Sequence, residues 1–153
     1  MDDGLDPTDR AILALLREDG RRSVADIAGR VALSATAVKR RLDRLERSGV
    51  ITGYSVQVDL ARMGWTVSAF VELRFAGKTT PEVMHRAASG LPEVSATYTT
   101  AGEEDVIALV HATSLDHLRD VIAKLRSASS IISTRTRVVL DAHIKADWHP
   151  PGS

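Results

Sequence analysis

The sequence of 153 residues contains no cysteine, no long apolar run and no excess of charge of either sign. Without cysteine, disulfide bonds, cysteine-ligated zinc and thiol catalysis are excluded, and a reducing compartment fits best. No stretch approaches the roughly 20 apolar residues of a membrane span, and the acidic start does not resemble a signal peptide. We therefore expect a cytoplasmic protein with no membrane partner.

The charges balance, with 20 basic and 20 acidic residues, which is unusual for a protein that coats nucleic acid nonspecifically. Basic residues gather in one place: residues 39–47 hold five of them and two acidic residues, a local charge of +3. A basic surface confined to one short segment is expected of a dimer that reads a defined DNA site.

Residues 23–48 have the pattern of a helix-turn-helix, with the turn at residues 31–33. Ser23 and Ser34 are good N-cap residues for the first and second helix of the pair. In the second helix, the helical period places four apolar residues on the inward side: Ala35, Val38, Leu42 and Leu45. An upstream helix over residues 5–17, with Asp6 as N-cap and Pro7 in its first turn, completes a trihelical DNA-binding core. An amphipathic helix that is merely solvated is the alternative, and the two partner helices argue against it.

Seven polar residues of this segment are candidates for contacts to double-stranded DNA: Ser34, Thr36, Lys39, Arg40, Arg41, Arg44 and Arg47. Thr36 and Arg40 are assigned to base edges, because the N-terminal half of a recognition helix enters the major groove most deeply. Lys39, Arg44 and Arg47 are assigned to phosphates, and Ser34 to capping or phosphate contact. Arg41 lies at the edge of the face, where a salt bridge within the protein is an equal alternative.

Beyond residue 50 the apolar period changes from 3.6 to 2, which indicates strands. We expect a strand over residues 50–58, a connector, and then a βαββαβ unit with strands at 67–75, 94–100, 106–112 and 131–140. Its helices are expected at 81–89 and after the N-cap Ser114, the second with five inward residues: Leu115, Leu118, Val121, Ile122 and Leu125. The predicted class is α+β, an antiparallel ferredoxin-like sandwich with both helices on one face. A second subunit is the simplest cover for the other face.

Four motifs, in order, resemble the Lrp/AsnC family of feast/famine regulators: LDPTDRAIL at 5–13, LS through RL at 33–42, LERSGVITGY at 45–54 and GEED at 102–105. The resemblance implies a transcription regulator with a winged or near-winged helix-turn-helix, and a C-terminal domain that assembles dimers into tetramers or octamers. It also implies an amino acid or related metabolite as effector, bound between dimers. The effector residues that it assigns are Gly102, Asp105, Ser133, Thr134 and Thr136.

Residues of these types fit the implied ligand, since backbone N–H groups of a glycine turn hold a carboxylate and Asp105 attracts an ammonium group. Ordinary turn chemistry explains glycine and acidic residues in the same place. Val106, where relatives often have an aromatic or larger aliphatic residue, and the acidic pair Glu103 and Glu104 depart from the family pattern. These departures leave three alternatives open: the effector pocket is altered, it prefers a basic ligand, or no effector binds.

These patterns divide the chain into a DNA-binding domain at 1–52, a strand and linker at 53–66, an effector and oligomerisation domain at 67–141 and a tail at 142–153. No metal or cofactor is expected. One alternative is an architectural DNA-binding protein without an effector. A second is an enzyme similar to the siroheme decarboxylases, which share this architecture. Its proton donors would be sought among the five histidines, which lack metal-ligand spacing: His85, His111, His117, His143 and His149.

Overall fold

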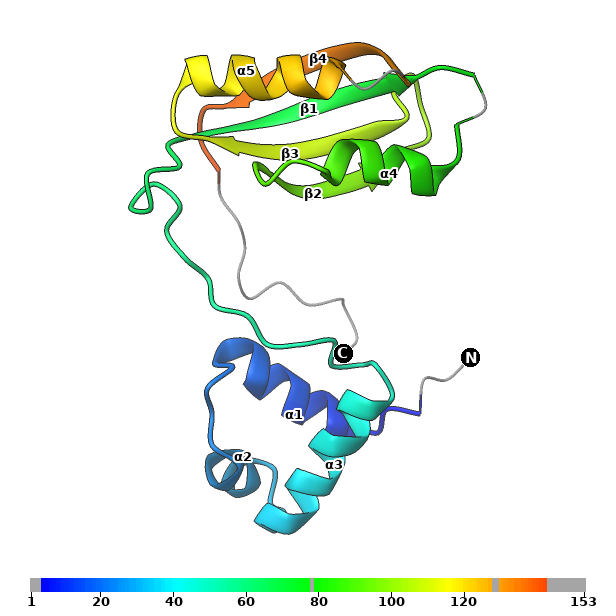
Figure 1. Cartoon of the computed structure of the whole chain (residues 1–153). Helices are drawn as coiled ribbons and strands as arrows, with labels where there is room; N and C mark the ends of the chain where they lie inside the picture. Colours follow the sequence, from blue (N-terminus) through cyan, green and yellow to red (C-terminus); the bar gives the residue numbers. More distant parts are fainter. Residues whose placement is uncertain (1–3, 78, 128–129, 143–153) are drawn as a thin grey trace. The chain divides into compact units, whose positions relative to one another are not determined.

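The computed structural model of the chain describes residues 4–77, 79–127 and 130–142, which form two compact units that divide between Gln57 and Val58 (Figure 1). Apart from residue 142, the predicted tail lies outside the described residues, and so do His143 and His149. Within the described ranges no helix has both the length and the apolar character needed to cross a membrane.

Three helices build the first unit: α1 (Pro7–Glu18), α2 (Val24–Arg30) and α3 (Ala35–Arg47). Each begins at the predicted cap, where a side chain accepts a hydrogen bond from a backbone N–H in the first turn. Asp6 caps α1 in a reciprocal capping box with Asp9, Ser23 caps α2 and Ser34 caps α3. The helices pack around Ile12, Ile27, Ala28, Val38 and Leu42, which confirms the predicted trihelical core.

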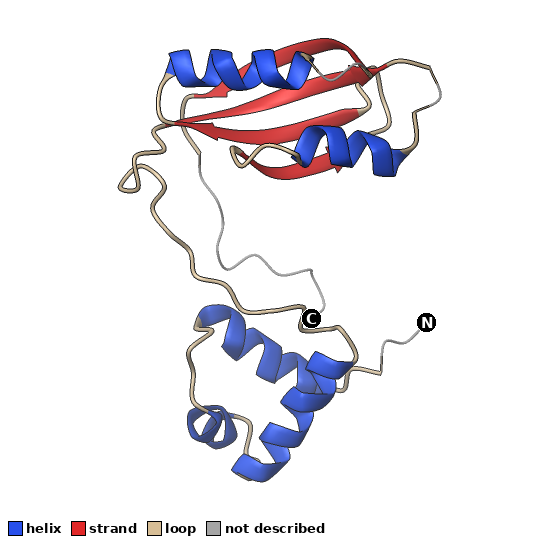
Figure 2. Ribbon diagram, in the orientation of Figure 1, coloured by secondary structure: helices blue, strands red, loops and turns tan. Residues whose placement is uncertain are grey.

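The second unit is a four-stranded antiparallel sheet in the order β2-β3-β1-β4 (Figure 2). Its elements are β1 (Val67–Phe75), α4 (Pro81–Ser89), β2 (Val94–Thr99), β3 (Val106–Ala112), α5 (Leu115–Arg126) and β4 (Ile131–Val139). The βαββαβ order and the antiparallel sheet confirm the predicted fold class.

One face of the sheet forms the core of this unit. Alternate residues of β1, Ala69, Val71 and Leu73, are fully buried and share a single apolar cluster with α4 and α5. Both helices therefore cover the same face, as predicted. On the other face, Phe70 and Tyr98 keep 41% and 55% of their surface exposed, so this face carries apolar surface that none of the described residues covers.

The strand predicted at residues 50–58 is wrong, because the structure has no strand there. A strand forms only where a neighbour accepts and donates its backbone hydrogen bonds, and none of the described segments pairs with this one. Its apolar side chains stay exposed, to 84% at Val56 and 54% at Val58. Apolar and polar residues do alternate in this segment, but alternation alone does not supply a pairing partner.

Two residues assigned to inward helix faces lie on the surface instead: Ala35 in α3 and Leu115, which is 64% exposed, in α5. Each stands three positions before the first buried residue of its helix, Val38 or Leu118. That spacing places it about 60° around the helix axis from that buried residue, at the edge of the packed stripe. At the first turn of a helix, this edge position has no neighbouring element to cover it.

Candidate DNA interface and effector turn

Helix α3 packs against the rest of the helical unit with its apolar face and leaves its polar face exposed. Val38, Leu42 and Leu45 are buried, and the Ser34 hydroxyl accepts a hydrogen bond from the Ala37 N–H at 3.2 Å. Thr36 therefore lies exposed in the first turn. The predicted cap is confirmed, while contact between Ser34 and DNA stays a prediction.

Four basic residues of α3 remain exposed: Lys39, Arg40, Arg44 and Arg47. Lys39 lies 2.6 Å from Asp43 in an ion pair along the helix, and Arg47 donates from Nε to the Asp43 carbonyl at 3.1 Å. Among the residues that the structure describes, Arg40 has neither an ion pair nor a side-chain hydrogen bond. It is the arginine of this face that is free to meet a new acceptor.

Arg41 has a partner within the protein. Its guanidinium donates to Asp6 at 2.6 Å and to Asp9 at 2.8 Å, and its side chain is only 24% exposed. Of the two roles that the sequence left open for Arg41, the structure has the salt bridge. Arg44 also bonds to Asp9 but keeps about half of its side chain exposed.

A hollow forms on the surface above these ion pairs. It is lined by Asp6, Arg40, Arg41, Arg44 and Arg47. Counting these residues with the buried Asp9, four guanidinium groups face two carboxylates, which leaves the hollow positively charged. An anion such as a phosphate is the ligand that this charge and the planar guanidinium donors favour.

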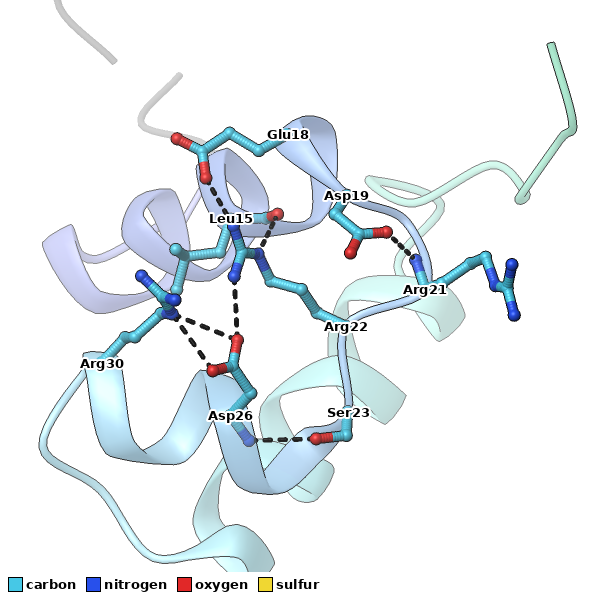
Figure 3. A network of polar contacts seen from close by, with 8 residues as sticks. All are labelled: Leu15, Glu18, Asp19, Arg21, Arg22, Ser23, Asp26 and Arg30. Carbon is cyan, nitrogen blue, oxygen red and sulfur yellow. Dashed lines mark hydrogen bonds and ion pairs between the residues drawn. The ribbon is translucent and has the colours of Figure 1, made fainter.

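A second network joins α1 to α2 (Figure 3). Arg22 in the connection donates from Nε to the Leu15 carbonyl at 3.0 Å and forms ion pairs with Glu18 at 2.6 Å and Asp26 at 2.9 Å. Arg30 reaches Asp26 from the other side. Because Arg22 bonds to both helices, it fixes the position of α2 against α1 and supports the base on which α3 packs.

The carboxylates beneath the hollow make the helical unit sensitive to acid. Burial opposes ionisation of Asp9, but hydrogen bonds from Arg41, the Asp6 N–H and Arg44 hold the pKa of its carboxyl below the ordinary value. Because the pKa is lower in the folded state than in the unfolded state, the ionised carboxyl stabilises the fold at pH values above the unfolded-state pKa. That contribution is lost as the pH falls through the folded-state pKa. We expect the unfolding free energy to fall between about pH 5 and pH 2, and to fall less in Asp9→Asn. Urea unfolding followed by circular dichroism at stepped pH measures this, and equal pH dependence in both proteins would contradict it.

The turn between β2 and β3 is tied to the end of β1. The Asp105 N–H donates to the Leu73 carbonyl at 3.0 Å, and Asp105 Oδ2 accepts from the Phe75 N–H at 2.7 Å. Within the described residues Oδ1 accepts no hydrogen bond. Gly102 has open space where a side chain would stand and its φ lies outside the left-handed region. Neither packing within the chain nor backbone strain requires glycine at this position.

The residues predicted from β4 only partly meet this turn. Thr134 lies opposite Leu73 in the sheet, next to the strand end that Asp105 holds, but its hydroxyl accepts a hydrogen bond from Arg126 Nε at 2.7 Å. Thr136 lies two residues further along the strand and shares the face covered by the helices. Ser133 is exposed on the opposite face. The structure therefore brings Gly102, Asp105 and the start of β4 to one end of the sheet without joining all five residues.

Two groups at these sites were not predicted. Arg135 of β4 forms ion pairs with Glu104 of the turn at 3.0 Å and with Glu72 of β1 at 3.5 Å. Asp9, fully buried beneath α3, was expected only as part of the first helix. Each pairs with residues far away in the sequence, so the only available signal was a charge inside an otherwise apolar pattern.

The three described histidines have partners that explain them without catalysis. His85 bonds to the hydroxyls of Thr97 and Thr99, and His111 to those of Ser68 and Ser95. His117 accepts from the Thr113 N–H at 3.2 Å and lies 3.2 Å from Glu93. The side chains of the three histidines share no side-chain partner, and the link between His111 and His117 is the Glu93 carbonyl, which accepts from the His111 backbone N–H at 2.8 Å.

Residues 5–52 match the family described as winged helix-turn-helix DNA-binding, and residues 68–148 match the Lrp/AsnC ligand binding domain. The chain is similar to the HTH-type transcriptional regulator Rv2324 of Mycobacterium tuberculosis, 39% identical over 97% of this chain and 99% of the relative. It also resembles the solved feast or famine regulatory protein Rv3291c of M. tuberculosis complexed with L-methionine. That likeness has a TM-score of 0.90 and 32% identity, and covers 97% of this chain and 100% of the other. A further solved structure is the complex of transcriptional regulator NMB0573 of Neisseria meningitidis with L-methionine, with a TM-score of 0.84, 26% identity and coverage of 93% and 95%.

Proposed function

Since this chain belongs to the Lrp/AsnC family of DNA-binding transcription regulators, we propose that it reads a defined DNA site with α3 and senses an amino acid at the turn between β2 and β3. The observation that carries the proposal for α3 is its exposed face, where an unpaired Arg40 borders a positively charged hollow. A helix of this kind fits the major groove, where guanidinium groups reach base edges and phosphates.

We assign DNA contacts to the residues of α3 from two considerations: how deeply each residue would enter the major groove, and which partners its side chain already has within the protein. We assign Thr36 and Arg40 to base edges, and Lys39, Arg44 and Arg47 to phosphates, with Ser34 at the groove entrance. Arg41 is the exception, because its Nη1 already donates to both Asp6 and Asp9 and its side chain is only 24% exposed. We keep Arg41 in the proposed interface only because it lines the hollow.

For the effector, L-methionine in two solved relatives supports an amino acid as the ligand class. The described geometry is compatible with that ligand. Oδ1 of Asp105, which accepts no hydrogen bond from the described residues, could accept one from an ammonium group. The open space beside Gly102 would let a carboxylate reach the backbone N–H groups of the turn. We propose Gly102 and Asp105 as the centre of the site. Ser133, Thr134 and Thr136 are proposed as its margin, supplied in part by a neighbouring copy.

Self-association completes the proposal. The uncovered sheet face carries Phe70 and Tyr98 at its exposed positions, and a second copy is the cover that the family architecture provides. We propose a dimer that assembles further into a tetramer or octamer, with the domain limits predicted above. We place the protein in the cytoplasm, where a DNA-binding regulator of this family would meet its DNA.

Two other functions would use the same fold. An architectural DNA-binding protein would bind DNA without any effector, and the L-methionine complexes of relatives favour a sensor over it. A decarboxylase similar to those acting on siroheme would use histidines as proton donors, and the hydroxyl and backbone partners of the described ones favour packing roles. Spectral titration with a tetrapyrrole tests this second function.

Removal of Arg44 is expected to weaken DNA binding without changing sequence preference. Arg44→Ala should reduce affinity for cognate and random duplexes by a similar factor and make the salt dependence shallower by about one unit, because one phosphate contact is lost. Fluorescence anisotropy at several salt concentrations measures both slopes, with Arg119→Ala in α5 as the control. An unchanged slope for Arg44→Ala would remove it from the phosphate contacts.

The direct test of DNA recognition is a gel shift with purified protein and a duplex from the region upstream of its own gene. A scrambled duplex of equal composition is the competitor. The proposal expects a complex that survives excess competitor. Equal loss of the complex to cognate and scrambled competitor would contradict the reading of a defined site.

A further inference from the structure

Asp9 is a charged residue in the apolar interior of the helical unit. It is fully buried in α1, yet its carboxylate has three donors: Arg41 on Oδ1, and the Asp6 N–H and Arg44 on Oδ2. Asp6 adds a second carboxylate to the same cluster, bonding to Arg41 at 2.6 Å and to the Asp9 N–H at 2.8 Å. We refer to Asp6, Asp9 and Arg41 as the clasp, because Arg41 bonds to both carboxylates, whereas Arg44 keeps about half of its side chain exposed.

Ion pairs of this kind orient the helices that they join more than they stabilise the fold. Burying paired charges costs desolvation energy, and well-packed apolar residues of similar volume often stabilise a fold equally well or better. Charge-assisted hydrogen bonds, in contrast, are directional and hold planar guanidinium groups in one orientation. The clasp is therefore suited to fixing how α3 lies on α1.

Arg41 lies in the middle of α3 and bonds to Asp6 and Asp9 at the start of α1. Arg40 directly precedes Arg41 in α3, and both residues line the hollow. Holding Arg41 against Asp6 and Asp9 fixes the rotation of α3 about its own axis. That rotation decides where the unpaired Arg40 points.

We propose that Asp9 is a positioning residue for DNA recognition, which acts through the clasp to aim Arg40 at the base edges of the bound site. The proposal rests on the proposed role of α3. A base contact needs a donor placed within a few tenths of an ångström, whereas nonspecific binding needs only positive charge near the phosphates. Asp9 is therefore required for specific binding and dispensable for nonspecific binding.

For the variant Asp9→Asn, the positioning role and simple electrostatics predict opposite changes in affinity for the cognate duplex. It removes a negative charge beside a phosphate-binding face, so charge alone would strengthen binding to every duplex. The positioning role instead predicts about a tenfold loss of affinity for the cognate upstream duplex, with affinity for the scrambled duplex unchanged or increased. Partial unfolding would lower both affinities by one factor and leave their ratio as in the wild type.

A double-mutant cycle tests whether Asp9 acts through Arg40. Fluorescence anisotropy is measured for wild type, Asp9→Asn, Arg40→Ala and the double variant on both duplexes. We expect the tenfold effect of Asp9→Asn to shrink below about threefold in the Arg40→Ala background, because the contact that it aims is already gone. Asp6→Asn, which keeps a capping residue and loosens the clasp from its exposed side, should reproduce the loss of specificity in a milder form.

The matched control is Asp43→Asn, which removes a carboxylate from α3 outside the clasp and should not lower the ratio of cognate to scrambled affinity. Wild-type binding tests the proposed function, and the difference between wild type and Asp9→Asn tests the clasp, so the two can fail separately. Cognate affinity for Asp9→Asn equal to or above that of the wild type would overturn the proposal. An undiminished effect in the Arg40→Ala background would also overturn it.

Discussion

Arg40→Ala is expected to weaken binding to the cognate duplex by about 1–3 kcal/mol, which is roughly 5- to 150-fold, and to relax selectivity at one base pair. Arg40 is exposed in the N-terminal half of α3, and no described residue takes its donors, so we expect its guanidinium to be free for a contact in the groove. A bidentate contact to the acceptor edge of guanine is the pairing that this side chain makes best. Anisotropy titrations with duplexes altered one base pair at a time measure both effects.

The control for this prediction is Arg44→Ala, whose loss should be alike on cognate and random DNA. An Arg40→Ala variant that loses equal affinity for both duplexes would place Arg40 on a phosphate. The base contact would then have to come from Thr36 or another residue of the first turns of α3.

Asp105→Ala is expected to damage both the fold of the sheet unit and its response to an effector. The carboxylate accepts the Phe75 N–H at 2.7 Å, where the pairing of β1 with β4 shifts register, so its removal leaves a partly buried donor without a partner. The expected cost is about 1–3 kcal/mol in unfolding free energy. Urea unfolding of the variant and the wild type measures it.

Asp105→Asn separates the two roles, because an amide oxygen can still accept from Phe75 while the negative charge is lost. We expect this variant to keep most of the wild-type stability and to lose the attraction for an ammonium group. Isothermal titration with amino acids compares the two binding affinities. A variant with unchanged affinity for the amino acid that binds the wild type would remove Asp105 from the effector site.

The helices could be predicted from the sequence because their determinants are local. Asp6, Ser23 and Ser34 cap the helices that follow them, and in the sheet unit Gly90 follows the end of α4. Each signal acts within a few residues of where it stands. The strands of the sheet followed from their period of 2 for the same reason.

The clasp and the ion pairs of the effector turn could not be predicted, since they join residues that only the tertiary fold brings together. Asp9 and Arg41 are 32 residues apart, and Glu104 and Arg135 are 31 apart. The segment at 50–58 failed for a related reason, because a strand depends on a partner that its own sequence does not specify. Local signals thus predicted the face of α3, and long-range contacts determine which of its arginines are free.

The measurement that tests the account most directly is the affinity of the wild-type protein for its upstream duplex, titrated with a panel of amino acids. The oligomeric state is followed in parallel by analytical ultracentrifugation. The account predicts specific binding that at least one amino acid strengthens or weakens, with the response lost in Asp105→Asn. Specific binding that no amino acid in the panel changes would contradict the sensor and favour an architectural DNA-binding protein.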